Sequence, residues 1–195
     1  MSFRTEKKYR LSYGDCFKLK SQLITIGMNK LYPDRQVNSE YLDTKELQMF
    51  SDSEEGVLPR KKIRIRWYND KVNQNLETKI SSIEGRFKKS EKFSSLERNK
   101  NFYLFDTYYG KIYPTIIVSY NREYYQFENL RITFDTKINY LNSRLQSLAK
   151  FNDKETVMEI KSTNLNVDDY INQLIHYPTS RFSKYSRGVH LTKIF

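Results

Sequence analysis

Basic side chains at alternate positions are the residues of this sequence that could do chemistry. Segment 60–68 places four cations on one face of an expected strand, namely Arg60, Lys62, Arg64 and Arg66. Successive side chains of a strand point to opposite faces, so the apolar residues between them form the other face. Like charges side by side repel each other unless an anion lies between them. The row therefore predicts a surface that binds an anion.

The same alternation recurs along the chain, with charged rows backed by apolar neighbours. The further rows are Arg4, Glu6, Lys8 and Arg10 in 3–11; Glu77 and Lys79 in 76–80; Glu84, Arg86 and Lys88 in 84–89; Tyr120, Arg122 and Tyr124 in 115–124; Arg131, Thr133, Asp135 and Lys137 in 130–138; and Glu155, Glu159 and Lys161 in 155–161. For any one strand, a solvated outer face explains the pattern equally well. Taken together, the rows favour a closed sheet whose cations face inward and bind a polyanion in a low-dielectric interior.

Acidic residues on these faces have two interpretations. Glu6, Glu77, Asp135 and Glu159 could simply pair with neighbouring cations, or one or two of them could hold Mg²⁺ or Mn²⁺, which take carboxylate and phosphate oxygens together. We expect Glu159 to be the strongest candidate. The sequence has no Cys/His cluster suited to zinc, and it lacks a P-loop, a GxSxG elbow and a Rossmann fingerprint.

The elements that position these residues are mainly strands. Period-two patterns predict six strands, at 3–11, 60–68, 76–80, 115–124, 130–138 and 155–161, with a weaker seventh at 84–89. Ser12 and Asp15 predict a helix that continues to about residue 23, with Phe17, Leu23 and Ile24 facing inward. A second helix is predicted at 167–176. Residues 44–59 and 90–110 are interpreted as polar connections, with a short helix near 94–101.

Length and charge set the remaining limits. A chain of 195 residues with 38% hydrophobic residues can bury one sizeable core, which predicts a single domain over 1–195. The net charge of +11 indicates an anionic partner such as a nucleic acid, a phosphate polymer or acidic lipid headgroups. Cys16 is the only cysteine, and the sequence contains no signal peptide and no apolar run long enough to span a membrane. We expect a cytoplasmic protein that could still associate with a membrane through a partner.

Several motifs, in order along nearly the whole chain, resemble the VTC domain of polyphosphate polymerases, a branch of the triphosphate tunnel metalloenzymes. The motifs are FRTEKKYRL at 3–11, YLDTKEL at 41–47, RKKIRIRWY at 60–68, LETK and GRFKK within 76–89, SYNREYY at 119–125, RITFD at 131–135, MEIK at 158–161 and SRFSKYSRG at 180–188. The resemblance implies an α+β, mainly antiparallel fold, an eight-stranded closed β-tunnel with a few helices packed outside.

The resemblance also implies the roles of individual residues. Residues implied in catalysis are Lys8, Arg64, Arg66, Arg122, Arg131, Lys161 and Lys184. Residues that the resemblance implies in substrate binding are Lys79, Lys88, Tyr120, Arg181 and Ser183. Arg4, Lys62 and Arg86 are expected to bind substrate because they belong to the charged rows. Arg181 stands where the family more often has lysine. Glu159 matches the metal-binding glutamate, and Glu6 stands where related tunnel enzymes carry acidic ligands for Mn²⁺ or Mg²⁺.

The implied activity is transfer of the γ-phosphoryl group of ATP or another NTP to a growing inorganic polyphosphate chain. A metal-dependent tripolyphosphatase or NTPase uses the same site with water as the acceptor, and a non-catalytic polyphosphate-binding or nucleic-acid-binding module is a third alternative. We expect no nucleic-acid partner, because Ile63, Ile65 and Trp67 lie opposite the arginines instead of beside them. The sequence lacks the SPX domain and membrane segment of eukaryotic relatives, so it resembles a bare bacterial version. Its first strand carries one acid where the CYTH branch has paired glutamates, and this difference disfavours a plain triphosphatase.

Overall fold

The computed structural model describes residues 5–94, 102–144, 150–164 and 167–192. Its elements in chain order are β1 (Thr5–Leu11), α1 (Tyr13–Thr25), β2 (Asn29–Asp43), α2 (Gln48–Glu55), β3 (Arg60–Tyr68), β4 (Asp70–Ser82), β5 (Gly85–Phe93), β6 (Leu104–Asp106), β7 (Gly110–Phe127), β8 (Leu130–Asn142), β9 (Lys150–Asn152), β10 (Thr156–Ser162), α3 (Asp168–Leu174) and α4 (Lys184–Thr192). The chain divides into two compact units, and four strands, β2, β7, β8 and β9, have residues in both. Unit 1 comprises Met1–Arg35, Tyr120–Ile138 and Asn152–Phe182, and unit 2 comprises Gln36–Ser119, Asn139–Phe151 and Ser183–Phe195.

Antiparallel pairing sets the order of the strands. The paired path through the described residues runs β1-β10-β8-β7-β2-β3-β4-β5, while β6 pairs with β7 and β9 with β8. The expected mainly antiparallel sheet with a few helices is confirmed. The expected closure of the sheet was overstated, because β1 and β5 stand at opposite ends of this path, and the described residues form ten strands instead of eight.

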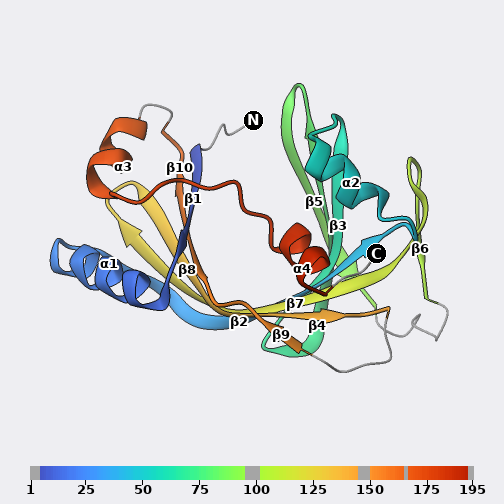
Figure 1. Ribbon diagram of the computed structural model, residues 1–195, viewed down its shortest axis with the longest axis horizontal. Helices are drawn as coiled ribbons and strands as arrows, with labels where there is room; N and C mark the ends of the chain where they lie inside the picture. Colours follow the sequence, from blue (N-terminus) through green and yellow to red (C-terminus); the bar gives the residue numbers. More distant parts are fainter. Residues whose placement is uncertain (1–4, 95–101, 145–149, 165–166, 193–195) are drawn as a thin grey trace. The chain divides into compact units, whose positions relative to one another are not determined.

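Unit 1 has a helix-covered apolar face. Helices α1 and α3 lie against strands β1, β8 and β10 (Figure 1). The core beneath them contains Tyr9 and Leu11 of β1, Ile132 and Phe134 of β8, and Met158 and Ile160 of β10. Burial of these side chains removes apolar surface from water, which is the main favourable term in folding. The charged residues that alternate with them are left on the other face of the same strands.

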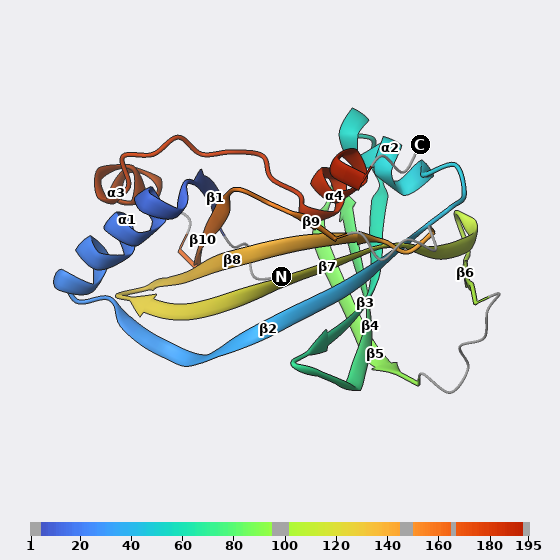
Figure 2. The same cartoon turned by 60° about the horizontal axis from the view of Figure 1, so that its bottom comes forward.

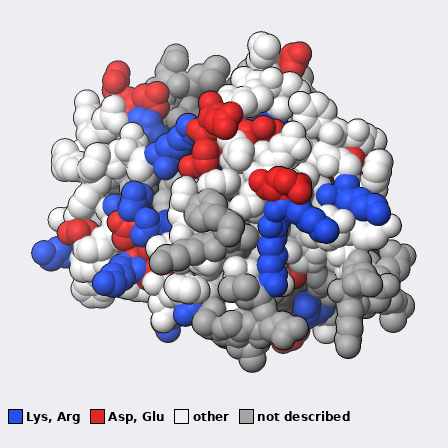
Figure 3. Space-filling model, turned by 45° about the vertical axis from the view of Figure 1, so that its right-hand side comes forward, with Lys and Arg blue, Asp and Glu red and all other residues white. Residues whose placement is uncertain are grey.

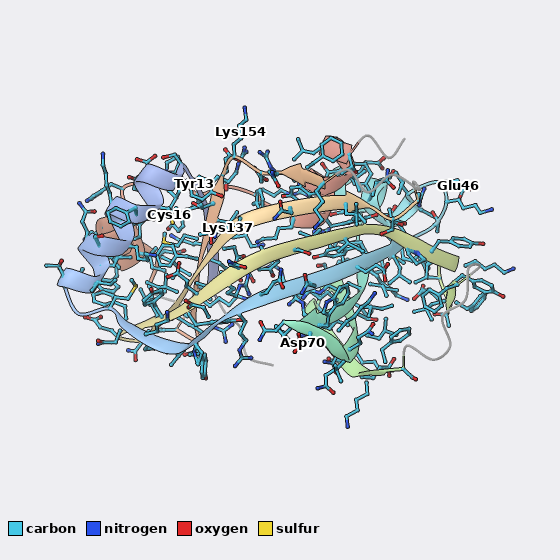
Figure 4. All side chains as sticks on the ribbon, turned by 90° about the horizontal axis from the view of Figure 1, so that it is seen from below. Tyr13, Cys16, Glu46, Asp70, Lys137 and Lys154 are labelled. Carbon is cyan, nitrogen blue, oxygen red and sulfur yellow. The ribbon has the colours of Figure 1, made fainter. Side chains whose placement is uncertain are left out.

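Helix α1 begins as expected but turns a different face to the core. The side chain of Ser12 accepts a hydrogen bond from the backbone amide of Asp15 at 3.1 Å, which satisfies one of the helix's unpaired amides. Cys16 and Leu23 are buried, whereas Phe17 is 68% exposed. Phe17 and Ile24, which we predicted to face inward, are thus exposed, because each lies about 100° around the helix from a buried residue that precedes it. Figure 4 labels buried Cys16 and exposed Tyr13 on this helix.

Unit 2 is built on the hairpins of β3, β4 and β5, which run side by side in Figure 2. Ile63, Ile65 and Trp67 of β3 pack into an apolar core with Leu42 of β2 and Met49 of α2. Helices α2 and α4 lie next to each other (Figure 1). The predicted apolar face of segment 60–68 is therefore confirmed as a core face.

The structure contains a strand that the sequence pattern did not predict, and two segments expected to be polar connections contain regular elements. Segment 29–43 is a long strand, although Pro33 removes a backbone donor and typically argues against a strand. Segment 44–59, expected to be a polar connection, contains α2, and strand β6 lies within 90–110. The short helix predicted near 94–101 falls almost entirely outside the described residues.

Candidate anion-binding site

Unit 2 carries a row of lysines across three neighbouring strands. Lys62 of β3 is paired in register with Lys79 of β4, which is paired with Lys88 of β5. The three ammonium groups therefore project from adjacent positions on one face of the sheet. Such a row of like charges is unfavourable by itself and is stabilised when an anion binds to it.

The next row of the same face contains a buried carboxylate surrounded by cations. Glu77 of β4 accepts hydrogen bonds from Arg64 Nη2 at 2.6 Å and from Lys88 Nζ at 2.6 Å, and Arg66 Nη1 lies 3.8 Å from its Oε2. Burial alone would raise the pKa of Glu77, but the two arginines and Lys88 lower it to about 2. Glu77 offsets a single positive charge in this group, which we call the unit 2 cluster: Lys62, Arg64, Arg66, Lys79, Lys88 and Glu77.

Two of the arginines of β3, Arg64 and Arg66, do not belong to a solvated face. Arg64 is 9% exposed and Arg66 is 8% exposed. Arg66 donates to the hydroxyl of Ser39 at 3.0 Å, and Lys62 donates to the hydroxyl of Ser183 at 3.0 Å. The alternative that the charged row of 60–68 simply faces water is therefore wrong for Arg64 and Arg66. Buried guanidinium groups require polar partners, and their electrostatic interactions are stronger than those of groups in water.

Unit 1 has a charged face of its own, and strand register defines it. On β1 and β10, Glu6 pairs with Lys161 and Lys8 pairs with Glu159. On β8, Arg131 is paired with Lys161. We define the unit 1 cluster by its charged residues: Glu6, Lys8, Arg122, Arg131, Asp135, Glu159 and Lys161. The expected charged rows of these strands are thus neighbours on one face, opposite the apolar core.

Acids balance most of the positive charge in the unit 1 cluster. Arg122 binds Asp135 through two hydrogen bonds of 2.5 and 2.7 Å, and Asp135 is completely buried. Burial alone would lower the pKa of Arg122, but Asp135 raises it well above its ordinary value. Lys161 Nζ lies 2.6 Å from Glu159 and 3.7 Å from Glu6. Lys161 thus contacts both carboxylates that the sequence identified as metal candidates.

Glu6 and Glu159, two of the three carboxylates of this cluster, have the chemistry of metal ligands. Burial alone would raise the pKa of Glu159, but Lys161, Arg122 and Lys8 hold it well below its ordinary value, so it stays a carboxylate. Burial and the charge of Glu159 would raise the pKa of Glu6, but Lys8 and Lys161 lower it overall. Two ionised carboxylates that both contact Lys161 fit Mg²⁺ or Mn²⁺, which proteins bind through one or two carboxylates together with substrate phosphates. Among the described residues, no group of three or more Asp, Glu, His or Cys side chains forms a metal site by itself.

The other predicted site residues lie in different surroundings. Tyr120 is buried, with the guanidinium of Arg122 5.3 Å from its ring centroid. Lys184 is the first residue of α4, while Arg86 and Arg181 are exposed. Arg4 lies outside the described residues. On the face drawn in Figure 3, several Lys and Arg side chains lie beside Asp and Glu side chains.

Sequence reasoning missed the residues of β2 that contact the unit 2 cluster. Ser39 and Tyr41 stand opposite Arg66 and Arg64 in the β2–β3 register. Arg64 Nη1 donates to the Tyr41 hydroxyl at 2.9 Å. The available signal was the YLDTKEL motif at 41–47, which carried the family resemblance but no expected strand.

The fold is shared with several solved structures at low sequence identity. A candidate adenylate cyclase from Bacillus halodurans matches with a TM-score of 0.62 and 13% identity, over 96% of this chain and 98% of that one. A candidate adenylyl cyclase from Hippeastrum with a dominant triphosphatase activity matches with a TM-score of 0.58 and 15% identity, over 96% of both chains. A protein from Pyrococcus horikoshii matches with a TM-score of 0.56 and 14% identity, over 97% of this chain and 98% of that one. The fold is that of the triphosphate tunnel proteins.

A family model assigns the chain more closely. The VTC domain model matches residues 3–104 and 81–193, which include residues of both units. The chain belongs to the VTC domain family. No curated protein matches the chain. Over the described part of the chain, no helix has both the length and the apolar character needed to cross a membrane.

Proposed function

We propose that this protein is a polyphosphate polymerase that transfers the γ-phosphoryl group of ATP, or of another NTP, to the end of an inorganic polyphosphate chain. The observation that carries the proposal is the buried pair Arg64 and Arg66 within a cluster of five cations and one carboxylate. Membership of the VTC domain family and the tunnel fold support an enzyme that acts on phosphates.

Phosphoryl transfer requires mainly positioning and charge neutralisation from the protein. In the unit 2 cluster, Arg64 and Arg66 bind phosphate oxygens through their planar guanidinium groups, and Lys62, Lys79 and Lys88 supply further charge. Ser183 and Lys184 hold the phosphates of the donor nucleotide. Here the protein contributes fixed donors that need no rearrangement when negative charge develops on the leaving diphosphate.

In the unit 1 cluster, Lys8, Arg122, Arg131 and Lys161 bind phosphate oxygens, while Glu159 and Glu6 would hold Mg²⁺ or Mn²⁺. The ion would neutralise phosphate charge and orient phosphate oxygens. Asp135 fixes the guanidinium of Arg122 through its two hydrogen bonds. In the overall reaction, the bond between the γ-phosphorus and the β,γ-bridging oxygen breaks, a terminal polymer oxygen bonds to that phosphorus, and NDP leaves.

A metal-dependent triphosphatase is the second candidate, because the Hippeastrum protein with the same fold has a dominant triphosphatase activity. Incubation of the purified chain with ATP and Mn²⁺ separates the two candidates. Long polyphosphate supports the polymerase, whereas orthophosphate with no polymer supports the triphosphatase and overturns our proposal. Absence of turnover with tight tripolyphosphate binding would identify a non-catalytic binder.

Single substitutions test the residues on which the proposal depends. Arg64→Ala and Arg66→Ala should each lower the rate of polymer formation by a factor of about 100 or more, because each removes a preorganised charge from the reacting phosphates. Lys61→Ala is the matched control, since Lys61 lies on the opposite face of β3 and pairs with Asp106 at 2.9 Å. Wild-type rates in both arginine variants would place these side chains outside the site.

A further inference from the structure

A line of buried contacts in unit 2 begins at Asp43, the last residue of β2. Its side chain is completely buried and accepts hydrogen bonds from the backbone amides of Met49 and Phe50, both at 2.9 Å. These amides belong to the first turn of α2, where Leu47 provides no side-chain cap. Asp43 therefore caps α2 from a distance and is itself held in one position.

Tyr185 of α4 forms the next link. Its hydroxyl donates a hydrogen bond to Asp43 Oδ2, and its side chain is buried. Its ring stacks on that of Tyr41, with centroids 4.9 Å apart and planes inclined by 19°. Because Asp43 fixes the hydroxyl end of Tyr185, the stacked ring restricts how Tyr41 can move.

Tyr41 connects this line of contacts to Arg64. Arg64 Nη1 donates to the Tyr41 hydroxyl at 2.9 Å, while its Nε and Nη2 donate to Glu77 at 2.9 and 2.6 Å. The guanidinium is therefore gripped at two edges, by a hydroxyl from β2 and a carboxylate from β4. Two fixed edges leave the planar group with one orientation. Residues that support a binding site often fix its side chains in this way.

We propose that Tyr41, braced by Tyr185 and Asp43, is a positioning residue that orients Arg64 toward phosphate and weakens phosphate binding when its own hydroxyl ionises. This inference rests on the proposed function, since it assumes that Arg64 binds phosphate. Asp43 and Tyr185 act through Tyr41, and none of the three needs to touch the substrate.

The charges that act on Tyr41 explain why ionisation of its hydroxyl should weaken phosphate binding. Arg64 and Arg66 face it from β3 and Lys79 from β4, while Tyr185 covers its ring from α4. Burial alone would raise the pKa of Tyr41, but these three cations lower it to about 7. Below that pH the hydroxyl is neutral, and above it a phenolate offsets one positive charge of the cluster. Phosphate binding should therefore weaken as the pH rises through about 7.

The test compares tripolyphosphate binding by the wild-type chain and Tyr41→Phe at pH values on either side of neutrality, using calorimetry. At acidic pH the variant should bind about fivefold more weakly, because Arg64 loses one hydrogen bond. The ratio of the variant's affinity to that of the wild type should then rise by up to about tenfold per pH unit as the phenolate forms in the wild type alone. Titration of the ligand itself affects both proteins equally and cancels in this ratio.

Tyr103→Phe is the matched control, because Tyr103 also lies beside a cation, with Lys111 Nζ 4.8 Å from its ring centroid, but outside the cluster. Its affinity ratio to the wild type should stay constant with pH. A constant ratio in Tyr41→Phe as well would overturn the inference while leaving the proposed function intact. Failure of the wild type to bind tripolyphosphate at any pH would overturn the proposed function and the inference with it.

A second measurement needs no variant and so does not depend on its folding. The ultraviolet absorbance of tyrosinate in the wild type should show a tyrosine that titrates near neutral pH. Bound tripolyphosphate adds negative charge beside Tyr41, so this step should move to higher pH when the ligand is present. An absorbance step that is missing, or that the ligand does not move, would contradict the proposed role of Tyr41.

Discussion

Replacing Glu77 by glutamine should separate the stability of the unit 2 cluster from its affinity for anions. The substitution keeps the shape of the side chain but removes the carboxylate charge that contacts Arg64 and Lys88 at 2.6 Å and Arg66 at 3.8 Å. Three cations would then lie together at a buried position without a counter-charge. We therefore expect the variant to be less stable than the wild type and to bind anions more tightly.

The size of the stability loss follows from the electrostatics. The fall in the pKa of Glu77 from 4.5 to about 2 corresponds to about 3 kcal/mol of stabilisation at neutral pH. Because the folded-state pKa is lowered, this contribution is present above about pH 4.5 and is lost as the pH falls toward 2. Removal of one partner from a buried ion pair typically costs about 3–5 kcal/mol, which agrees in magnitude.

Urea denaturation at neutral pH, with and without tripolyphosphate, is the appropriate assay. Tripolyphosphate should stabilise Glu77→Gln more than it stabilises the wild type, because the ligand replaces the missing negative charge. Glu91→Gln is the matched control, since the exposed pair of Glu91 with Lys89 should contribute less than about 1 kcal/mol. If Glu77→Gln were as stable as the wild type, or if tripolyphosphate stabilised both equally, the reasoning about this cluster would be refuted.

Two further substitutions test other parts of the structure. Gly188→Ala should destabilise the protein by about 1–3 kcal/mol in the same denaturation assay, because a Cβ there would overlap Ile116 and lie 2.7 Å from Tyr140. Gly14→Ala, whose Cβ would make an ordinary contact with Ser12 Oγ at 3.8 Å, should not be destabilised, and equal stability of the two variants would contradict this packing. Glu159→Gln should raise the Mn²⁺ concentration needed for half-maximal turnover by about tenfold or more if Glu159 holds the ion. The control Glu155→Gln should leave that concentration unchanged. An unchanged Mn²⁺ requirement in Glu159→Gln would exclude Glu159 as a ligand.

The sequence predicted those parts of the fold whose pattern is local. Strand 60–68 alternates charged and apolar residues without interruption, and its predicted bounds match β3. Ser12 and Asp15 similarly marked the start of α1 through a contact three residues apart. In such segments a single face or cap determines the structure, and neighbouring residues reveal it.

Other parts depend on residues that are distant in the sequence. Helix α2 begins after Leu47, which has a left-handed φ of 61° and provides no side-chain cap. Its first amides are capped from the end of β2 and the loop after it, by Asp43 and by the hydroxyl of Thr44, so no capping residue stands at the start of the helix to announce it. Tyr41 and Tyr185 meet only because β2 and α4 pack together, which alternation along one segment cannot predict. The identities of the cations could be read from the sequence, whereas the residues that hold them in place could not.

The most direct test of the central claim is a crystal structure of the chain with tripolyphosphate and Mn²⁺. The account predicts phosphate oxygens within hydrogen-bonding distance of the guanidinium groups of Arg64 and Arg66, and Mn²⁺ bound to Glu159. Tripolyphosphate bound elsewhere, with Arg64 and Arg66 contacting only Glu77, Tyr41 and Ser39, would contradict it.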